Sequence, residues 1–127
     1  MLDGIHHAAI ICSNYQLSRD FYTRILGLKV VAENYRNDRD SWKLDLALPD
    51  GCQIELFSFP DRPPRPSYPE ALGLRHLAFR VRNLDEEIAR LQACGVQTEP
   101  VRRDEYTGKF FTFFSDPDML PLEIYEL

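Results

Sequence analysis

The sequence lacks several features that mark large classes of proteins. No apolar stretch approaches the roughly 18 residues of a membrane-spanning helix. The first residues do not combine a basic stretch with an apolar one, so we expect no signal peptide. Positive charge is in deficit, with a net charge of −5, whereas nucleic acids and anionic membranes attract proteins with a basic face. We therefore expect neither nucleic acid nor a membrane as a partner.

Cysteine is also scarce. The chain has Cys12, Cys52 and Cys94, an odd number without clustering, which is typical of free thiols in a reducing cytosol. No histidine stands at a motif spacing from these cysteines, and no glycine-rich phosphate loop is present. The composition, 44% hydrophobic and 28% charged over 127 residues, is that of one globular domain. We expect a cytoplasmic protein.

What the chain does contain is an internal repeat. The stretch "HAAIICSN" from His7 matches "HLAFRVRN" from His76, and "PDGCQIELF" from Pro49 matches "PDMLPLEIY" from Pro117. The first offset is 69 residues and the second is 68. Two separate matches at nearly one offset indicate a duplicated unit.

The copies span about 4–59 and 73–127 of a single domain, with a proline-rich linker at about 60–72. Prolines favour an extended spacer there; the alternative is a flap over a site, or a dimer arm, that carries Arg62 and Arg65.

Each copy has the pattern of a βαβββ unit. In the first we expect a strand from His7, a helix at 14–26, and strands near 28–36, 42–48 and 52–59. In the second we expect a strand at 75–82, a helix at 84–94, and strands near 97–103, 109–115 and 120–126. Ser13 or Asn14 can cap the first helix and Asn83 the second. Apolar stripes follow: Leu17, Phe21 and Ile25, then Leu84, Ile88 and Leu91.

The repeat makes four polar residues equivalent in pairs: His7 with His76, and Glu55 with Glu123. Each glutamate alternates with aliphatic residues in its strand, and a carboxylate inside a sheet needs a partner. Two imidazoles and two carboxylates suit a divalent transition metal such as Zn, Ni, Co, Mn or Fe. The alternative is two hydrogen-bonded histidines and two glutamates at a sheet edge.

Several stretches resemble the vicinal oxygen chelate superfamily, and within it the glyoxalase I–like branch. They are "HHAAIICSNYQLSRDFYTRILGLKVV", "IELF", "RHLAFRV" and "SDPDMLPLEIYEL", and the resemblance covers essentially the whole chain. It implies the α+β fold of the glyoxalase, bleomycin resistance and dioxygenase proteins, in which two tandem βαβββ units form curled, mostly antiparallel sheets. It also implies metal ligands at His7, Glu55, His76 and Glu123.

The activity that this resemblance implies is that of a divalent-metal-dependent lyase or isomerase. Its substrate would chelate the metal through vicinal oxygens and react through a proton shuttle and an enediolate. Glu123 is the first candidate for the base and Glu55 the second. Zn, Ni, Co or Mn is expected; iron is disfavoured, since related extradiol dioxygenases use two histidines and only one carboxylate. The alternatives are a small-molecule binding protein of the same fold and an Fe(II) extradiol-type dioxygenase.

The resemblance says less about the substrate. Glutathione-using members carry an arginine and an asparagine where this chain has Ile11 and Phe59. Arg80 follows His76 by four residues and shares its strand face, which makes it a possible anion anchor or a solvated arginine. The substrate-binding candidates are Arg80, Arg39, Lys43, Phe59 and Phe111. Proteins of this fold often form homodimers, and we expect one here.

One departure from the family concerns a turn. The family's "DPDG" reads "DPDM" here, with Met119 in place of glycine, while the first copy keeps Gly51. A turn with positive φ is therefore expected to be less favourable at residue 119.

Overall fold

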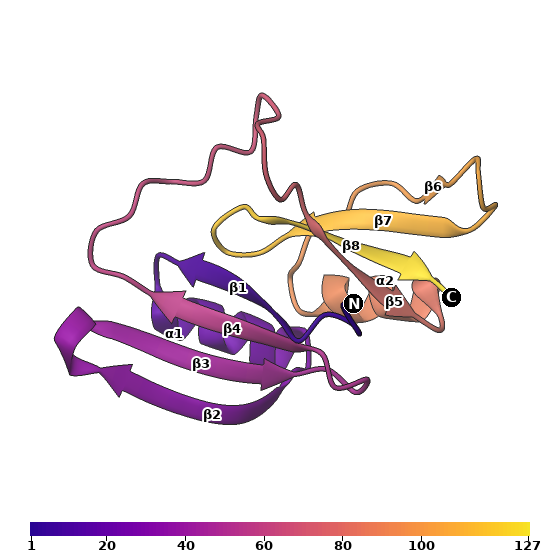
Figure 1. The fold of residues 1–127 in the computed structure, drawn as a ribbon. Helices are drawn as coiled ribbons and strands as arrows, with labels where there is room; N and C mark the ends of the chain where they lie inside the picture. The colour runs from indigo at the N-terminus through magenta and orange to yellow at the C-terminus, as the bar shows by residue number, and fades with distance from the viewer. The chain divides into compact units, whose positions relative to one another are not determined.

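The computed structural model describes residues 1–127. Two compact units, Met1–Pro63 and Pro64–Leu127, divide the chain within the proline-rich linker. Each unit contains a four-stranded mixed sheet with a helical segment on one face (Figure 1). The predicted α+β fold of two tandem βαβββ units is confirmed. No helix has the length and the apolar character needed to cross a membrane.

The first unit follows the predicted order of elements closely. Its elements are β1 (His7–Cys12), α1 (Tyr15–Asp20), η1 (Phe21–Ile25), β2 (Lys29–Arg36), η2 (Asn37–Arg39), β3 (Ser41–Ala47) and β4 (Gln53–Ser58). The strands lie in the order β1-β4-β3-β2, with β1 parallel to β4 and the other pairs antiparallel. The two ends of the repeat unit, β1 and β4, therefore become neighbours in the sheet.

The first helix begins where its cap predicts, because the side chain of Asn14 accepts a hydrogen bond from the Leu17 N–H at 3.1 Å. It then widens into a π-helical turn, in which the Leu26 N–H donates to the Phe21 carbonyl. The predicted stripe is wrong at Leu17, whose surface is 54% exposed. Tyr15 and Ser18 face the sheet instead, and successive helical residues are about 100° apart, which turns Leu17 away.

The core of the first unit lies between this helix and one face of the sheet. Alternation along the strands sends their aliphatic residues to that face and the polar residues to the other. The buried aliphatic residues of the strands are Ile10, Leu44, Leu46, Ile54 and Leu56. The opposite face of the same sheet carries His7, Lys43, Asp45 and Glu55.

A polar network ties the first helix to β2. The Glu33 carboxylate accepts hydrogen bonds from Arg19 Nε, at 2.8 Å, and from the Tyr15 hydroxyl. The Arg19 and Tyr15 hydrogen bonds lower the pKa of Glu33, so the carboxylate stays ionised and the network stays intact at neutral pH.

The second unit repeats the plan. Its elements are β5 (Leu77–Val81), α2 (Leu84–Ala93), β6 (Arg102–Arg103), β7 (Phe110–Ser115) and β8 (Pro121–Glu126). The strand order β5-β8-β7-β6 matches that of the first sheet, again with its first and last strands parallel. Asn83 caps α2 through the Glu86 N–H, and Leu84 and Leu91 are buried against the sheet.

The strand expected at 97–103 is wrong in length, since only Arg102–Arg103 pairs as a strand. The Glu99 N–H still donates to the Phe113 carbonyl at 2.9 Å. Pro100 follows, and a proline has no N–H to continue the ladder of hydrogen bonds. Pro100 therefore interrupts the pairing: the Glu99 hydrogen bond lies before it, and the two-residue edge strand Arg102–Arg103 begins after it.

Both units close their last hairpin with equivalent turns. The Gly51 N–H donates to the Leu48 carbonyl, and the Met119 N–H donates to the Asp116 carbonyl, each at 3.0 Å. The φ angle is +93° at Gly51 and +66° at Met119. The left-handed conformation expected at residue 119 is thus adopted by a residue with a side chain, at a steric cost that glycine avoids.

We predict that Met119→Gly stabilises the protein. The side chain is 66% exposed, so little buried surface is lost, and relief of the left-handed strain contributes roughly 0.5–1 kcal/mol after the extra chain entropy of glycine is subtracted. Urea denaturation would measure the gain as a higher midpoint. Gly51→Ala is the matched control and is expected to lower the midpoint; a lower midpoint for Met119→Gly would contradict the account.

Candidate functional site

The same strand register positions a histidine and a glutamate in both sheets. In the first unit Ala9 of β1 lies beside Glu55 of β4; in the second, Ala78 of β5 lies beside Glu123 of β8. Each alanine follows the histidine of its unit by two residues, so the histidine shares the face of the glutamate. The small alanine leaves room above it. Each unit therefore brings one imidazole and one carboxylate together on the face opposite its aliphatic core.

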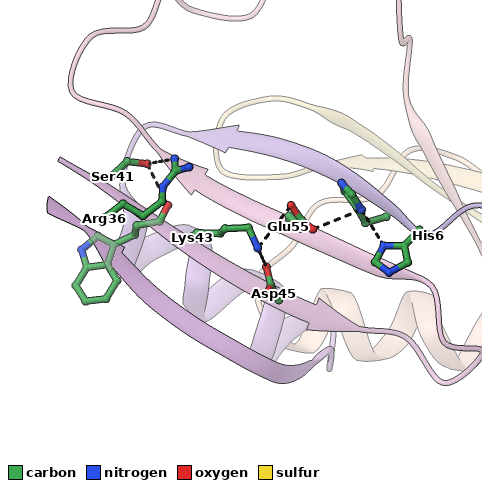
Figure 2. A network of polar contacts seen from close by, with 8 residues as sticks. His6, Arg36, Ser41, Lys43, Asp45 and Glu55 are labelled. Atoms are coloured by element: carbon green, nitrogen blue, oxygen red, sulfur yellow. Dashed lines mark hydrogen bonds and ion pairs between the residues drawn. The ribbon is translucent and has the colours of Figure 1, made fainter. Parts of the chain in front are cut away.

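In the first unit the pair belongs to a chain of polar contacts. Nδ1 of His7 lies 3.4 Å from Oε2 of Glu55, and it also contacts Nδ1 of His6 at 2.9 Å. Nζ of Lys43 lies 2.7 Å from Oδ1 of Asp45 and 3.8 Å from Oε1 of Glu55. Figure 2 shows this series of polar contacts running across the sheet. The His7 side chain is 40% exposed and that of Glu55 only 13%, so the pair is open on its imidazole side.

In the second unit the histidine and the glutamate lie closer together and are less exposed to solvent than in the first. Nε2 of His76 lies 2.9 Å from Oε2 of Glu123, and the exposed fractions of the two side chains are 27% and 11%. The edge of the Phe113 ring contacts the imidazole, with 4.9 Å between ring centres. The other ring nitrogen of His76, Nδ1, is buried without a hydrogen-bond partner. Glu123 has no lysine or arginine partner here, whereas Glu55 has Lys43.

The donor atoms of each pair are spaced as ligands of one metal ion would be. Two ligand atoms about 2.1 Å from an ion are roughly 3.0 Å apart at an octahedral angle and 3.4 Å apart at a tetrahedral one. The observed separations are 2.9 Å and 3.4 Å. Neither unit alone gathers three or more His, Cys, Asp or Glu side chains suited to a metal ion. Each unit by itself therefore presents one imidazole and one carboxylate, which is a pair of possible metal ligands.

Around the glutamates the two sheets differ in character. In the first sheet Asp45 lies opposite Glu55, and Lys43 lies two residues away on the same strand face. In the second sheet Phe113 lies opposite Glu123, and Phe111 lies opposite Tyr125. The equivalent positions are thus charged in one unit and aromatic in the other, so the duplicated units are not interchangeable as binding surfaces.

The substrate-binding candidates lie in different settings. Phe111 stacks on Tyr125, with ring centres 6.0 Å apart, and Phe59 stacks on Phe57 at the same separation. Arg80 pairs in register with Tyr125, on the face that carries Ala78. Arg39 lies in η2, 61% exposed, with its Nε 3.8 Å from Asp38. The register therefore assigns Lys43, Phe111 and Arg80 to the faces that carry the histidine–glutamate pairs, and Arg39 to a turn beyond the sheet.

Two further residues lie on these faces: Asp45, which was not predicted from the sequence as a site residue, and Arg36, which the sequence suggested with Arg39 and Lys43 as a possible anion anchor. Asp45 contacts Lys43, and Arg36 lies over the rings of Phe57 and Phe59. The signal for Asp45 was the alternation Ser41, Lys43, Asp45, which points these side chains to one face. The sequence suggested both Arg36 and Arg39 as anion anchors and could not choose between them; the structure places Arg36 at the end of β2 and Arg39 in η2.

Comparison with known proteins identifies the family. The family model of the Glyoxalase/Bleomycin resistance protein/Dioxygenase superfamily matches residues 4–124, and the chain belongs to this superfamily, as the resemblance predicted. It is 57% identical to the uncharacterized protein YwkD of Bacillus subtilis over 99% of this chain and 98% of the relative. The identity to the uncharacterized protein YaeR of Escherichia coli is 56%, over 98% and 97%. A crystal structure of the glyoxalase family protein from Enterococcus faecalis is similar, with 52% identity, a TM-score of 0.91 and 98% of each chain covered.

We predict that Lys43→Met destabilises the metal-free protein by about 1 kcal/mol at neutral pH. Lys43 is the cation between Asp45 and Glu55, which lie directly opposite each other on neighbouring strands, so its loss leaves two carboxylates in repulsion. Adding Asp45→Asn to Lys43→Met should recover most of the lost stability, because it removes one of the two carboxylates. Urea denaturation can measure this recovery. Lys29→Met, at the exposed start of β2, is the control; equal effects of both lysine variants would contradict this role.

Proposed function

We propose that the chain is a divalent-metal-dependent lyase or isomerase of the glyoxalase I–like kind. The observation that carries this proposal is the repeated His–Glu pair, with metal-like donor separations in both units. The superfamily includes metalloenzymes, and its members often bind a divalent metal. The ligands would be His7, Glu55, His76 and Glu123, drawn from one chain or from two chains of a homodimer. Zn, Ni, Co and Mn all accept two imidazoles and two carboxylates.

When bound, the metal would act as a Lewis acid that stabilises negative charge on the vicinal oxygens of a small substrate. The chain's own residues would move the proton. Glu123 takes a proton from the carbon next to a carbonyl and returns it to the adjacent carbon, so no atom is gained or lost. Its side chain is 11% exposed, which limits exchange of that proton with water.

The contacts of the two glutamates support different roles. Glu55 shares its carboxylate with Lys43, while Glu123 has only His76 as a basic partner. A carboxylate engaged by an ammonium group is better suited to hold a position than to shuttle a proton. We therefore assign the base to Glu123 and a ligand role to Glu55.

Metal analysis of the purified protein tests this proposal. We expect one divalent metal per chain in the wild type and at least a tenfold weaker metal affinity in Glu123→Gln, because a charged ligand is lost. Glu105→Gln is the matched control, since it removes the same charge from an exposed turn between β6 and β7. Circular dichroism would verify that the variants fold. A wild-type protein that folds normally and takes up no divalent metal would favour the second candidate, a small-molecule binding protein of the same fold.

A glyoxalase assay with methylglyoxal and glutathione tests whether the substrate is a glutathione adduct. We expect weak or no turnover by the metal-loaded protein, because Ile11 and Phe59 occupy the positions where glutathione-using relatives carry an arginine and an asparagine. Ile11 lies beside Phe57 in the sheet, which gives this region an apolar surface. Robust turnover would contradict the importance given to these two positions.

A further inference from the structure

Arg36 carries a positive charge that no carboxylate of the chain neutralises. Its Nη2 donates a hydrogen bond to the Ser41 hydroxyl at 2.9 Å. The guanidinium carbon lies 4.9 Å from the centre of the Phe57 ring and 5.7 Å from that of Phe59. Its Nε is buried and has no hydrogen-bond acceptor. By contrast, Lys43 is paired with Asp45 and Glu55, so its charge is already balanced.

The strand register assigns Arg36 to the face that carries the His7–Glu55 pair. Arg36 lies opposite Ser41, which shares a face with Asp45, and Asp45 lies opposite Glu55. The guanidinium stands over Phe57, two residues beyond Glu55 on β4, a separation of roughly 7 Å along the strand. Figure 2 shows Arg36 and Glu55 on the same side of the sheet, with Lys43 near them.

The surroundings of Arg36 are those of a prepared anion-binding group. Stacking on aromatic rings holds the planar guanidinium rigidly and stabilises its charge. Because Nε is buried, an arriving oxygen would accept from the Nη groups, and the anion would offset a guanidinium charge that the chain leaves unpaired. Carboxylates and phosphates offer two oxygens to an arginine and form its strongest pairs. The serine hydroxyl leaves most of the guanidinium donors available for such a ligand.

We propose that Arg36 binds a negatively charged oxygen group of the substrate, either a carboxylate or a phosphate-like group. This inference rests on the proposed function, because the chelating oxygens of the substrate would lie near Glu55. The substrate would then be a small acid, with its anionic group roughly 7 Å from the chelating oxygens. Of the three residues that the sequence suggested as anion anchors, Arg36, Arg39 and Lys43, the contacts favour Arg36.

Anion binding to the metal-free protein tests this inference. Inorganic phosphate and malonate are titrated separately into isotope-labelled protein, and amide shifts near Arg36 and Phe57 are followed by NMR. We expect saturable binding of at least one anion, with an affinity that is tenfold or more weaker in Arg36→Met. The affinity should fall less in Arg36→Lys, which keeps the positive charge but lacks the planar guanidinium that binds two oxygens at once. The tighter anion distinguishes a phosphate-like group from a carboxylate.

Arg24→Met is the matched control, because Arg24 lies in η1, 61% exposed and paired with Asp20; its anion affinity should stay within twofold of the wild type. Equal affinity in the wild type and Arg36→Met, or no saturable binding of either anion to the wild type, would overturn the inference. Metal content is measured on the same preparations. Anion binding through Arg36 in a protein that takes up no metal would support this inference and contradict the proposed function.

Discussion

The pairing of one imidazole with one carboxylate across two parallel strands is the interaction on which the rest depends. It occurs twice, because β1 beside β4 and β5 beside β8 have the same register, with an alanine next to each glutamate. A carboxylate that is about nine-tenths buried cannot remain without a partner. The histidine supplies that partner in each unit, and the same two atoms are a ready pair of metal ligands. The same histidine–glutamate pairing thus stabilises the buried carboxylate and, as we propose, provides ligands for a metal.

Duplication supplies symmetry, and later divergence makes the two copies unequal. Around Glu55 the sheet face is charged, with Asp45 opposite and Lys43 between the two carboxylates. Around Glu123 the corresponding face is aromatic, with Phe113 against His76. The two faces therefore offer different surfaces to a small molecule. The charged face suits a polar or anionic group, and the aromatic face limits the access of water to Glu123.

Much of the fold follows from the sequence because its signals are local. Alternation, asparagine caps and the repeat predict both βαβββ units and make the His–Glu pairs equivalent. What escapes prediction depends on longer-range packing. The rotation of the first helix, which exposes Leu17, is decided by contacts with the sheet and by a π-helical turn. The sequence suggests Arg36, Arg39 and Lys43 as anion anchors, but the choice of Arg36 depends on its contacts with two phenylalanines of a distant segment, which no local pattern reveals.

The central claim is that the two pairs serve a single cation. The most direct test is a zinc titration of the metal-free protein, with the imidazole nitrogens of His6, His7 and His76 followed by NMR. We predict that one equivalent of Zn²⁺ per chain shifts the ring signals of His7 and His76 together and to saturation; any shift of His6 follows that of His7, because the two rings are in contact. Saturation of only one of the two rings, or independent titration of the two with separate equivalents, would contradict the account.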